Sequence, residues 1–279
     1  MSFNAYYNGE FKSIEDIHIP LTDRAVFFGD GIYDAAIGRN GKIFMLDEHI
    51  ERFFSNLNYI GLPFSYSPVQ LKKLLLETVR LSDEKSYFVY FQLSRYSKNR
   101  VHAFPESEKS NLLITVTPFT LADEDKKVKL IIDEDRRHAL CNIKTINLLP
   151  AVLASHRADL CGADETIFTK NGIVTECSHS NVHIIKNSVL FTHPLDSSIL
   201  PGISRMHLLS LCRKLGVNYI ERPFSVKELI EADEVLVTSS SKLAVLASEI
   251  EGKIFDEKKD SLGKMLAKAM REEYLALTL

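Results

Sequence analysis

The stretch ALCNIKTINLLPAVLAS, residues 139–155, contains a single charged residue, Lys144. Ile143 and Ile146 flank it closely, which predicts a buried lysine rather than a surface one. Burial of a lysine disfavours its ammonium form and makes the amine a usable nucleophile and proton carrier near neutral pH. This is the chemistry of a lysine that forms a Schiff base. The same pattern also fits a lysine whose stem covers apolar surface while its head stays in water.

A single carboxylate stands out in the stretch GIVTECSHSNVHII, residues 172–185. Glu176 is the only acidic residue there, and strand-like apolar runs lie on both sides of it. An unpaired buried carboxylate is costly, so Glu176 should hold a partner. If a pyridine cofactor lies between the two residues, Glu176 can keep its ring nitrogen protonated while Lys144 carries its aldehyde.

The composition is that of an ordinary globular protein. A length of 279 residues and a hydrophobic content of 45% allow one large domain or two smaller ones. A net charge of -3 gives no basic surface for nucleic acid or an anionic membrane. No apolar run approaches the roughly 20 residues that span a bilayer, and the first residues do not resemble a secretory signal.

The four cysteines, Cys141, Cys161, Cys177 and Cys212, are widely scattered. They include no close pair of the kind that binds zinc or carries out redox chemistry, so no metal site is expected. We expect them to be reduced and partly buried in a cytoplasmic protein.

Sheet should dominate the first part of the chain. The pairs Asn8-Gly9 and Asn40-Gly41 predict tight hairpins, and residues 24–28, RAVFF, belong to a strand-like run. Two helices follow, one capped by Asp47 and one beginning at Ser67-Pro68. Strands at 86–94 and 111–119 then complete an α+β region.

The second part mixes strands and helices. We expect a strand at 128–132, a helix over about 147–160, a strand turn at Asn171-Gly172, a capping box over 225–228 and a helical tail from about residue 260. The predicted domains are a small N-terminal α+β domain at 1–118, a linker at 119–124 and a larger C-terminal domain at 125–279.

Two short stretches could bind an anion such as phosphate. Pro201-Gly202 leads into Ile203 and Ser204, where backbone N–H groups and a hydroxyl meet at a helix start. Ser239 and Ser240 follow a buried strand. Many helices begin with a serine and bind nothing, and the second serine pair also fits an ordinary polar turn.

Three basic residues are further candidates. Arg52 lies beside the buried face of a predicted helix, where a cation is normally solvated or salt-bridged. Arg100 and His102 are two residues apart, so an extended backbone would place both side chains on one face as a clamp for a carboxylate. Spacing alone also fits a basic surface loop.

Several motifs occur in one order: IKTINLL at 143–149, GADETIFTKNGIVTECSHSNV at 162–182, ILPGISR at 199–205 and VTSSS at 237–241. In this order they resemble the fold-type IV, class IV pyridoxal-phosphate aminotransferases, most closely the D-amino-acid aminotransferases. The resemblance runs from the NGEF hairpin at 8–11 to EIEGK at 249–253. It implies two domains with pyridoxal 5′-phosphate between them.

The resemblance also implies roles for individual residues. Lys144 and Glu176 would be catalytic, and Arg52, Ile203, Ser204, Ser239 and Ser240 would bind the phosphate. Arg100, His102 and Tyr33 would bind the α-carboxylate of the substrate. The family supplies the arginine and the histidine across a dimer interface, which implies a homodimer. In two places the chain differs, with Asp34 where the D-alanine enzymes carry glutamate and His179 where they carry serine.

The expected reaction is transamination between a D-amino acid, such as D-alanine or D-glutamate, and a 2-oxo acid through a Schiff base on Lys144. Two alternatives within the family are a branched-chain L-amino-acid aminotransferase and an aminodeoxychorismate lyase. An alternative from another class is a protein that binds pyridoxal phosphate without catalysis, because a fold alone never guarantees a function.

Overall fold

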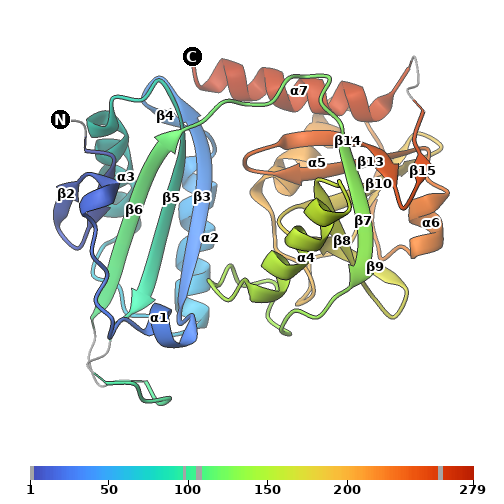
Figure 1. Cartoon of the computed structure of the whole chain (residues 1–279). Helices are drawn as coiled ribbons and strands as arrows, with labels where there is room; N and C mark the ends of the chain where they lie inside the picture. The colour runs from blue at the N-terminus through green and yellow to red at the C-terminus, as the bar shows by residue number, and fades with distance from the viewer. Residues whose placement is uncertain (1–2, 97–98, 105–108, 257–259) are drawn as a thin grey trace. The chain divides into compact units, whose positions relative to one another are not determined.

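The computed structural model describes residues 3–96, 99–104, 109–256 and 260–279. The chain divides into two compact units (Figure 1). The first contains residues 1–120, 143–147 and 277–279, and the second contains residues 121–142 and 148–276. The short stretch that carries Lys144 therefore groups with the first unit. The domain boundaries derived from the sequence stay predictions.

The first unit is built on a six-stranded antiparallel sheet with the strand order β2-β1-β6-β5-β3-β4. Asn8-Gly9 and Asn40-Gly41 form the two predicted tight turns, with positive φ at all four residues as such turns require. Both hairpin predictions are confirmed. The strands are β1 (Ala5–Tyr7), β2 (Glu10–Lys12), β3 (Gly31–Arg39), β4 (Lys42–Ile43), β5 (Ser86–Arg95) and β6 (Ser110–Pro118).

Two long helices, α2 (Leu46–Tyr59) and α3 (Pro68–Ser82), pack against this sheet. The start of α3 is confirmed, because Ser67 and Gln70 form a complete capping box. The prediction that Asp47 caps α2 is wrong. Met45, in the left-handed conformation, occupies the cap position, and Asp47 lies in the first turn of the helix. A carboxylate still stabilises the helix there, because the partial charge at a helix start is positive.

Residues Arg24–Phe28 form the short helix α1, which corrects the prediction of a strand. The side chain of Asp23 caps it by accepting a hydrogen bond from the N–H of Ala25, and Gly29 ends it in the left-handed conformation. The five residues are too few to show helical periodicity, and their aromatic and β-branched side chains favour a strand. The two caps stabilise the helix instead.

The second unit is built on a mixed nine-stranded sheet, in which β7 pairs in parallel with both β8 and β14 and β11 pairs in parallel with β12. The strands are β7 (Val128–Glu134), β8 (Glu165–Lys170), β9 (Ile173–Cys177), β10 (Asn181–Lys186), β11 (Val189–Thr192), β12 (Tyr219–Glu221), β13 (Glu234–Ser239), β14 (Leu243–Ile250) and β15 (Lys253–Ile254).

Four helices accompany this sheet: α4 (Leu149–Leu160), α5 (Ile203–Leu215), α6 (Val226–Ile230) and α7 (Leu262–Leu277). The capping box at Ser225 and Glu228 is confirmed. Helix α4 begins two residues later than predicted. The side chain of Asn147 instead donates a hydrogen bond to the carbonyl of Gly29 at 2.8 Å.

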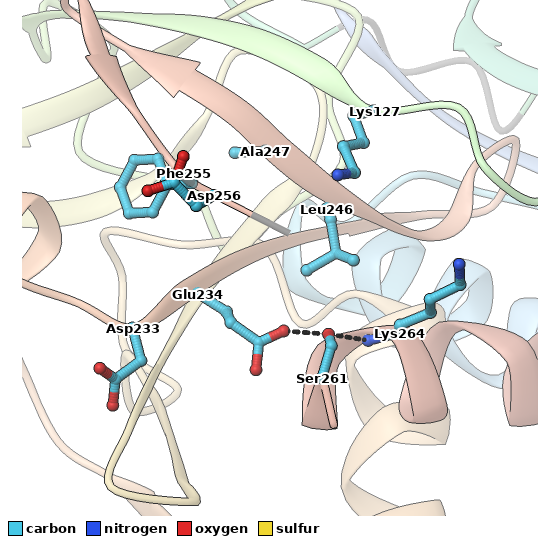
Figure 2. Close-up of a pocket in the computed structure, with 9 residues that line it drawn as sticks. All are labelled: Lys127, Asp233, Glu234, Leu246, Ala247, Phe255, Asp256, Ser261 and Lys264. Carbon is cyan, nitrogen blue, oxygen red and sulfur yellow. Dashed lines mark hydrogen bonds between the residues drawn. The ribbon is translucent and has the colours of Figure 1, made fainter. Parts of the chain in front are cut away.

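Glu234, at the start of β13, holds the beginning of α7 (Figure 2). Its carboxylate accepts hydrogen bonds from the N–H groups of Leu262 at 3.1 Å and Gly263 at 3.2 Å, and from the hydroxyl of Ser261. The carboxylate thus satisfies N–H groups that have no partner within the helix. The hydrogen bonds between Glu234 and residues 261–263 therefore stabilise the fold.

The two sheets with their helices agree with the predicted α+β class. Within the described ranges, no helix combines the length and the apolar character that crossing a bilayer requires.

A histidine lies at the centre of the second sheet. His183 on β10 is fully buried and forms hydrogen bonds to the hydroxyls of Thr192 on β11 and Thr238 on β13, both at 2.9 Å. Burial, with a smaller contribution from the charge of Arg205, lowers the pKa of His183 to about 3. The imidazole is therefore neutral at physiological pH.

This lowered pKa predicts an acid sensitivity of the fold. In the unfolded chain the histidine binds a proton near pH 6.5, whereas in the folded chain His183 stays neutral down to about pH 3. The unfolded state therefore binds more protons below pH 6.5, and the free energy of unfolding falls as the pH falls. Between pH 7 and pH 5 the free energy of unfolding should fall by about 2 kcal/mol more in the wild type than in His183→Gln. Urea denaturation at the two pH values measures this difference.

His18→Gln is the matched control, because it removes an exposed histidine. It should keep the pH dependence of the wild type. Equal pH dependence in the wild type and His183→Gln would contradict the prediction.

Candidate active site

Lys144 lies on an extended stretch that is hydrogen-bonded to the beginning of β3. The N–H of Tyr33 donates to the carbonyl of Lys144 at 2.9 Å, and the N–H of Ile146 donates to the carbonyl of Gly31 at 3.2 Å. A side chain on Gly31 would meet the carbonyl oxygen of Leu93 at 2.6 Å and Cδ1 of Ile146 at 3.0 Å, so a glycine there permits β5 and the Lys144 stretch to approach closely. The backbone of the lysine is therefore fixed against the sheet of the first unit.

The amine of Lys144 lies 4.3 Å from the centre of the Tyr33 ring. Tyr33 in turn stacks on Tyr90 of β5, with the ring centres 5.4 Å apart. The lysine side chain is partly buried, which lies between the buried and the solvated alternatives derived from the sequence. An aromatic ring attracts a nearby ammonium group, so Tyr33 helps to orient the amine.

Asp34, next to Tyr33 on β3, is fully buried and holds Arg52 of α2. Nε of Arg52 donates to Oδ2 at 2.9 Å, and Nη2 donates to Oδ1 at 2.7 Å. His49 of the same helix forms a 2.8 Å hydrogen bond to Oδ1 through Nδ1. Arg52 is thus salt-bridged, as the sequence allowed, and its guanidinium plane is fixed by both carboxylate oxygens.

The charges in this cluster shift its pKa values. Burial alone would raise the pKa of Asp34, but Arg52 and His49 outweigh it and hold that pKa well below the usual range. Burial lowers the pKa of His49, and the charges of Arg52 and Lys144 act in the same direction against the opposing effect of Asp34. The cluster therefore holds an ionised carboxylate and a neutral imidazole at neutral pH.

Arg100 and His102 lie in the loop 99–104, and both are exposed. The two side chains lie against the same ring. The guanidinium carbon of Arg100 is 5.1 Å from the centre of the Phe28 ring, and the ring centres of His102 and Phe28 are 5.2 Å apart. Phe28 belongs to α1, the helix that the sequence did not predict.

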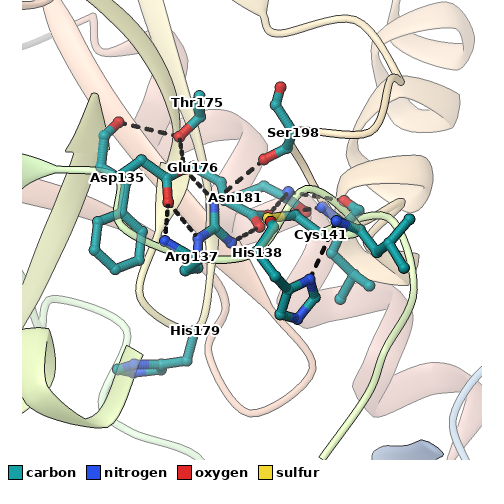
Figure 3. A network of polar contacts seen from close by, with 12 residues as sticks. Asp135, Arg137, His138, Cys141, Thr175, Glu176, His179, Asn181 and Ser198 are labelled. Atoms are coloured by element: carbon teal, nitrogen blue, oxygen red, sulfur yellow. Dashed lines mark hydrogen bonds and ion pairs between the residues drawn. The ribbon is translucent and has the colours of Figure 1, made fainter. Parts of the chain in front are cut away.

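Glu176, on β9 in the second unit, lies in a network of buried polar contacts (Figure 3). Oε1 pairs with the guanidinium of Arg137. Oε2 accepts hydrogen bonds from Nδ2 of Asn181 at 2.9 Å and from the N–H of Leu200 at 3.0 Å. The expectation that this carboxylate needs a partner is met by a protein side chain.

Arg137 belongs to this network but was not among the residues predicted from the sequence. It lies between Glu176 and Asp135, with two further bonds to Asp135 at 2.7 and 2.9 Å, and stacks 4.7 Å from the centre of the Phe168 ring. Burial by itself would lower the pKa of Arg137, but Asp135 and Glu176 outweigh burial and raise that pKa above its usual value. The available signal was an acidic residue and a basic residue two positions apart, Asp135 and Arg137, just before the Lys144 stretch.

The phosphate candidates of the second unit meet around Asn181 on β10. Its side chain bonds to Glu176 and to the carbonyl of Leu200 at 3.0 Å. A side chain on Gly202, the residue before α5, would meet Oδ1 of Asn181 at 2.1 Å, so any larger residue would force Asn181 to move. In the sheet, Asn181 lies directly opposite Thr238, the residue before Ser239.

Helix α5 begins at Ile203 with no side-chain cap from Gly202, which suits an anion at the first N–H groups. Ser204 is buried in its first turn. Ser239 accepts a hydrogen bond from the N–H of Lys242 at 3.3 Å, so the polar turn that the sequence allowed is present at Ser239 and Ser240. Asn181 thus contacts or pairs with the segments that carry four of the predicted residues, Glu176, Ile203, Ser204 and Ser239.

His179 forms part of a second polar cluster, with Lys242 and the fully buried Glu165. The amine of Lys242 lies 3.2 Å from Nε2 of His179 and forms an ion pair with Glu165. Glu165 also accepts a hydrogen bond from the N–H of His179 at 2.8 Å. The sequence singled out His179 but not its two partners, because Glu165 lies on β8 and Lys242 lies in the turn before β14, both far from His179 along the chain.

Residues 31–250 match the family model of the class IV aminotransferases. The D-alanine aminotransferase of Bacillus licheniformis is 34% identical over 248 residues, which cover 88% of each chain. The D-alanine aminotransferase of Listeria monocytogenes is 33% identical and covers 95% of this chain and 94% of its own. The chain belongs to the class IV aminotransferases.

Solved structures agree on the fold. A branched-chain aminotransferase from Thermoproteus uzoniensis, crystallised with norvaline, has a TM-score of 0.92 at 23% identity and covers 99% of this chain and 96% of its own. A putative 4-amino-4-deoxychorismate lyase from Legionella pneumophila has a TM-score of 0.86 at 23% identity, covering 93% and 97%. The prediction of a fold-type IV enzyme is confirmed. Class IV aminotransferases depend on pyridoxal 5′-phosphate, and the chain is an aminotransferase of this kind.

Arg137 should be important for stability because it neutralises two carboxylates. Arg137→Leu leaves Asp135 and Glu176 without their cation, which should lower the free energy of unfolding by about 3–5 kcal/mol. The neighbouring Arg136 is exposed and pairs with the exposed Glu134, so Arg136→Leu should change stability by less than about 0.5 kcal/mol. Chemical denaturation measures both, and equal effects of the two substitutions would show that the buried pairs do not stabilise the fold.

Proposed function

We propose that the chain catalyses transamination between a D-amino acid, such as D-alanine or D-glutamate, and a 2-oxo acid. The observation that carries the proposal is the 34% identity to D-alanine aminotransferases over 88% of the chain. Arg100 and His102 support it, since both lie against the Phe28 ring where they can act as one carboxylate-binding pair.

The residues present suit pyridoxal 5′-phosphate. The glycine before α5 leaves its uncapped N–H groups to an anion, and Ser204, Ser239, Ser240 and Arg52 add donors for a phosphate group. Glu176, held by Arg137, is a carboxylate suited to a protonated pyridine nitrogen. Lys144 is the residue that would carry the cofactor covalently.

The cofactor, when bound, supplies a ring that accepts the electron pair released from the amino acid. The protein supplies the proton transfers and the binding. Nζ of Lys144, oriented by the Tyr33 ring, removes the proton from Cα of the amino acid and later gives it up as a general acid. Tyr33, Arg100 and His102 bind the α-carboxylate, which fixes the face of Cα that the lysine reaches.

A homodimer is part of the proposal, with Arg100 and His102 supplied to the partner's site. Exposed apolar side chains on α4 support an association surface. Leu149, Val152, Leu153 and Leu160 are 68%, 57%, 56% and 73% exposed, although a helix in water normally turns such residues inwards.

The four free cysteines support a reducing, cytoplasmic location.

Three other functions are distinguished by the visible spectrum and by assays of pyruvate release and amino-group exchange. The visible spectrum of the purified protein should change with D-alanine and not with L-leucine. A change with L-leucine alone would favour a branched-chain L-amino-acid aminotransferase. Release of pyruvate from aminodeoxychorismate would identify a lyase, and a bound cofactor without amino-group exchange would identify a binding protein.

Lys144→Ala should abolish transamination, because no other group in the proposal carries the cofactor and moves the Cα proton. It should also remove the visible absorption band of the cofactor-loaded protein. Lys129→Ala, which removes a surface lysine paired with Glu249, should keep both. Turnover by Lys144→Ala at the wild-type rate would remove the central claim.

Arg100→Ala should raise KM for the D-amino acid at least about tenfold, since truncating one partner of a charge pair that the bound substrate buries costs about 2–5 kcal/mol. Steady-state kinetics at saturating 2-oxo acid measures this. Arg80→Ala, which removes an exposed arginine paired with Glu77 on α3, is the control and should keep the wild-type KM. An unchanged KM in Arg100→Ala would place the carboxylate-binding group elsewhere.

Mixing two variants tests whether the partner supplies the arginine. In a dimer of one Lys144→Ala chain and one Arg100→Ala chain, one site would regain both residues if Arg100 acts across the interface. Co-expression should therefore restore turnover at low substrate concentration. If Arg100 acts within its own chain, the mixed dimer has no complete site and turnover stays low.

A further inference from the structure

Arg24, the first residue of α1, is only 3% exposed and uses its guanidinium to hold the loop 99–104. Nη1 donates to the carbonyl of Val101 at 2.5 Å, and Nη2 donates to the carbonyl of His102 at 3.2 Å. Nε donates to the carboxylate of Asp30 at 2.6 Å. The arginine therefore joins the partly buried carboxylate of Asp30 to the backbone carbonyls of Val101 and His102.

The helix that carries Arg24 is itself anchored to the sheet of the first unit. Asp23 caps α1 with one carboxylate oxygen. Its other oxygen accepts hydrogen bonds from Ser94 of β5 at 2.8 Å and from Asn111 of β6 at 2.5 Å. The position of the Arg24 backbone is thus set by two central strands.

The same helix contacts the two side chains of the loop. The Phe28 ring lies 4.6 Å from the guanidinium carbon of Arg24, and Arg100 and His102 lie against it at 5.1 and 5.2 Å. Helix α1 therefore holds the loop backbone through Arg24 and the two side chains through Phe28.

We propose that Arg24 is a positioning residue for the substrate carboxylate, because its bonds to the loop backbone hold Arg100 and His102 ready for binding. This inference rests on the proposed function. Residues 100–104 are all exposed, so the loop gains little order from burial. Without Arg24, substrate binding would have to order the loop, and the entropy lost would weaken the affinity.

Lysine cannot replace the arginine here. A guanidinium presents a planar fork of donors that reaches Asp30, Val101 and His102 at the same time, whereas an ammonium is a single point charge. Arg24→Lys therefore keeps the charge beside Asp30 and removes the bonds to the loop.

The experiment measures KM and kcat for the D-amino acid in Arg24→Lys. KM should rise about tenfold, while kcat changes by less than about threefold, because the reacting groups are untouched. Arg271→Lys is the matched control. Arg271, on α7 of the second unit, likewise donates to a backbone carbonyl, that of Ala122 at 2.6 Å, so this variant should keep the wild-type KM.

Combining Arg24→Lys with Arg100→Ala separates positioning from general damage. If Arg24 acts through Arg100, Arg24→Lys should add at most about threefold to KM in the Arg100→Ala background. An equal effect in both backgrounds would overturn the inference. An unchanged KM in Arg24→Lys, beside a raised KM in Arg100→Ala, would overturn it and leave the proposed function standing.

If the proposed function itself is wrong, the single variant Arg100→Ala will have an unchanged KM. The inference about Arg24 is then wrong as well. Phe28→Leu provides a second variant should Arg24→Lys fail to fold. It removes the ring beneath both side chains, and KM should rise about threefold in the wild-type background only. No rise there would overturn the role of α1.

Discussion

A charge that leaves water needs an opposite charge beside it, and three carboxylates of this chain show the constraint. Asp34 is held by Arg52, Glu176 by Arg137 and Asp30 by Arg24. In each case the arginine offers a planar set of donors, so the pair defines a direction as well as a distance. Two of these groups have a second partner as well, since Arg95 also binds Asp30 and Asp135 also binds Arg137.

These pairs also connect the sheets to the elements around them. Asp34 on β3 orients Arg52 of α2, and Glu176 on β9 orients Arg137 in the segment after β7. Sheet strands are rigid, and side chains held from them keep their geometry better than side chains carried by loops alone. The structure thus places its ionisable groups on rigid elements and ties the exposed loop 99–104 back to α1.

Proteins with this fold share their architecture but differ in the substrates named for them. Proteins with closely similar folds are described as branched-chain aminotransferases and as a putative lyase, whereas the relatives more similar in sequence are D-alanine aminotransferases. A fold therefore does not select the substrate, and the choice depends on a few side chains in loops. In the proposed function those side chains are Arg100 and His102.

The sequence by itself determined the features that depend on local chemistry. Asn-Gly pairs adopt positive φ readily, and serine caps act within three residues, so the hairpins at 8–9 and 40–41 and the caps at Ser67 and Ser225 were predictable. The order of motifs around Lys144 likewise identified the family. Only the tertiary structure decided the partners of the buried charges. Arg137 meets Glu176 across 39 residues and Arg24 meets Val101 across 77, because the folding of the sheets, and no local pattern, brings those segments together.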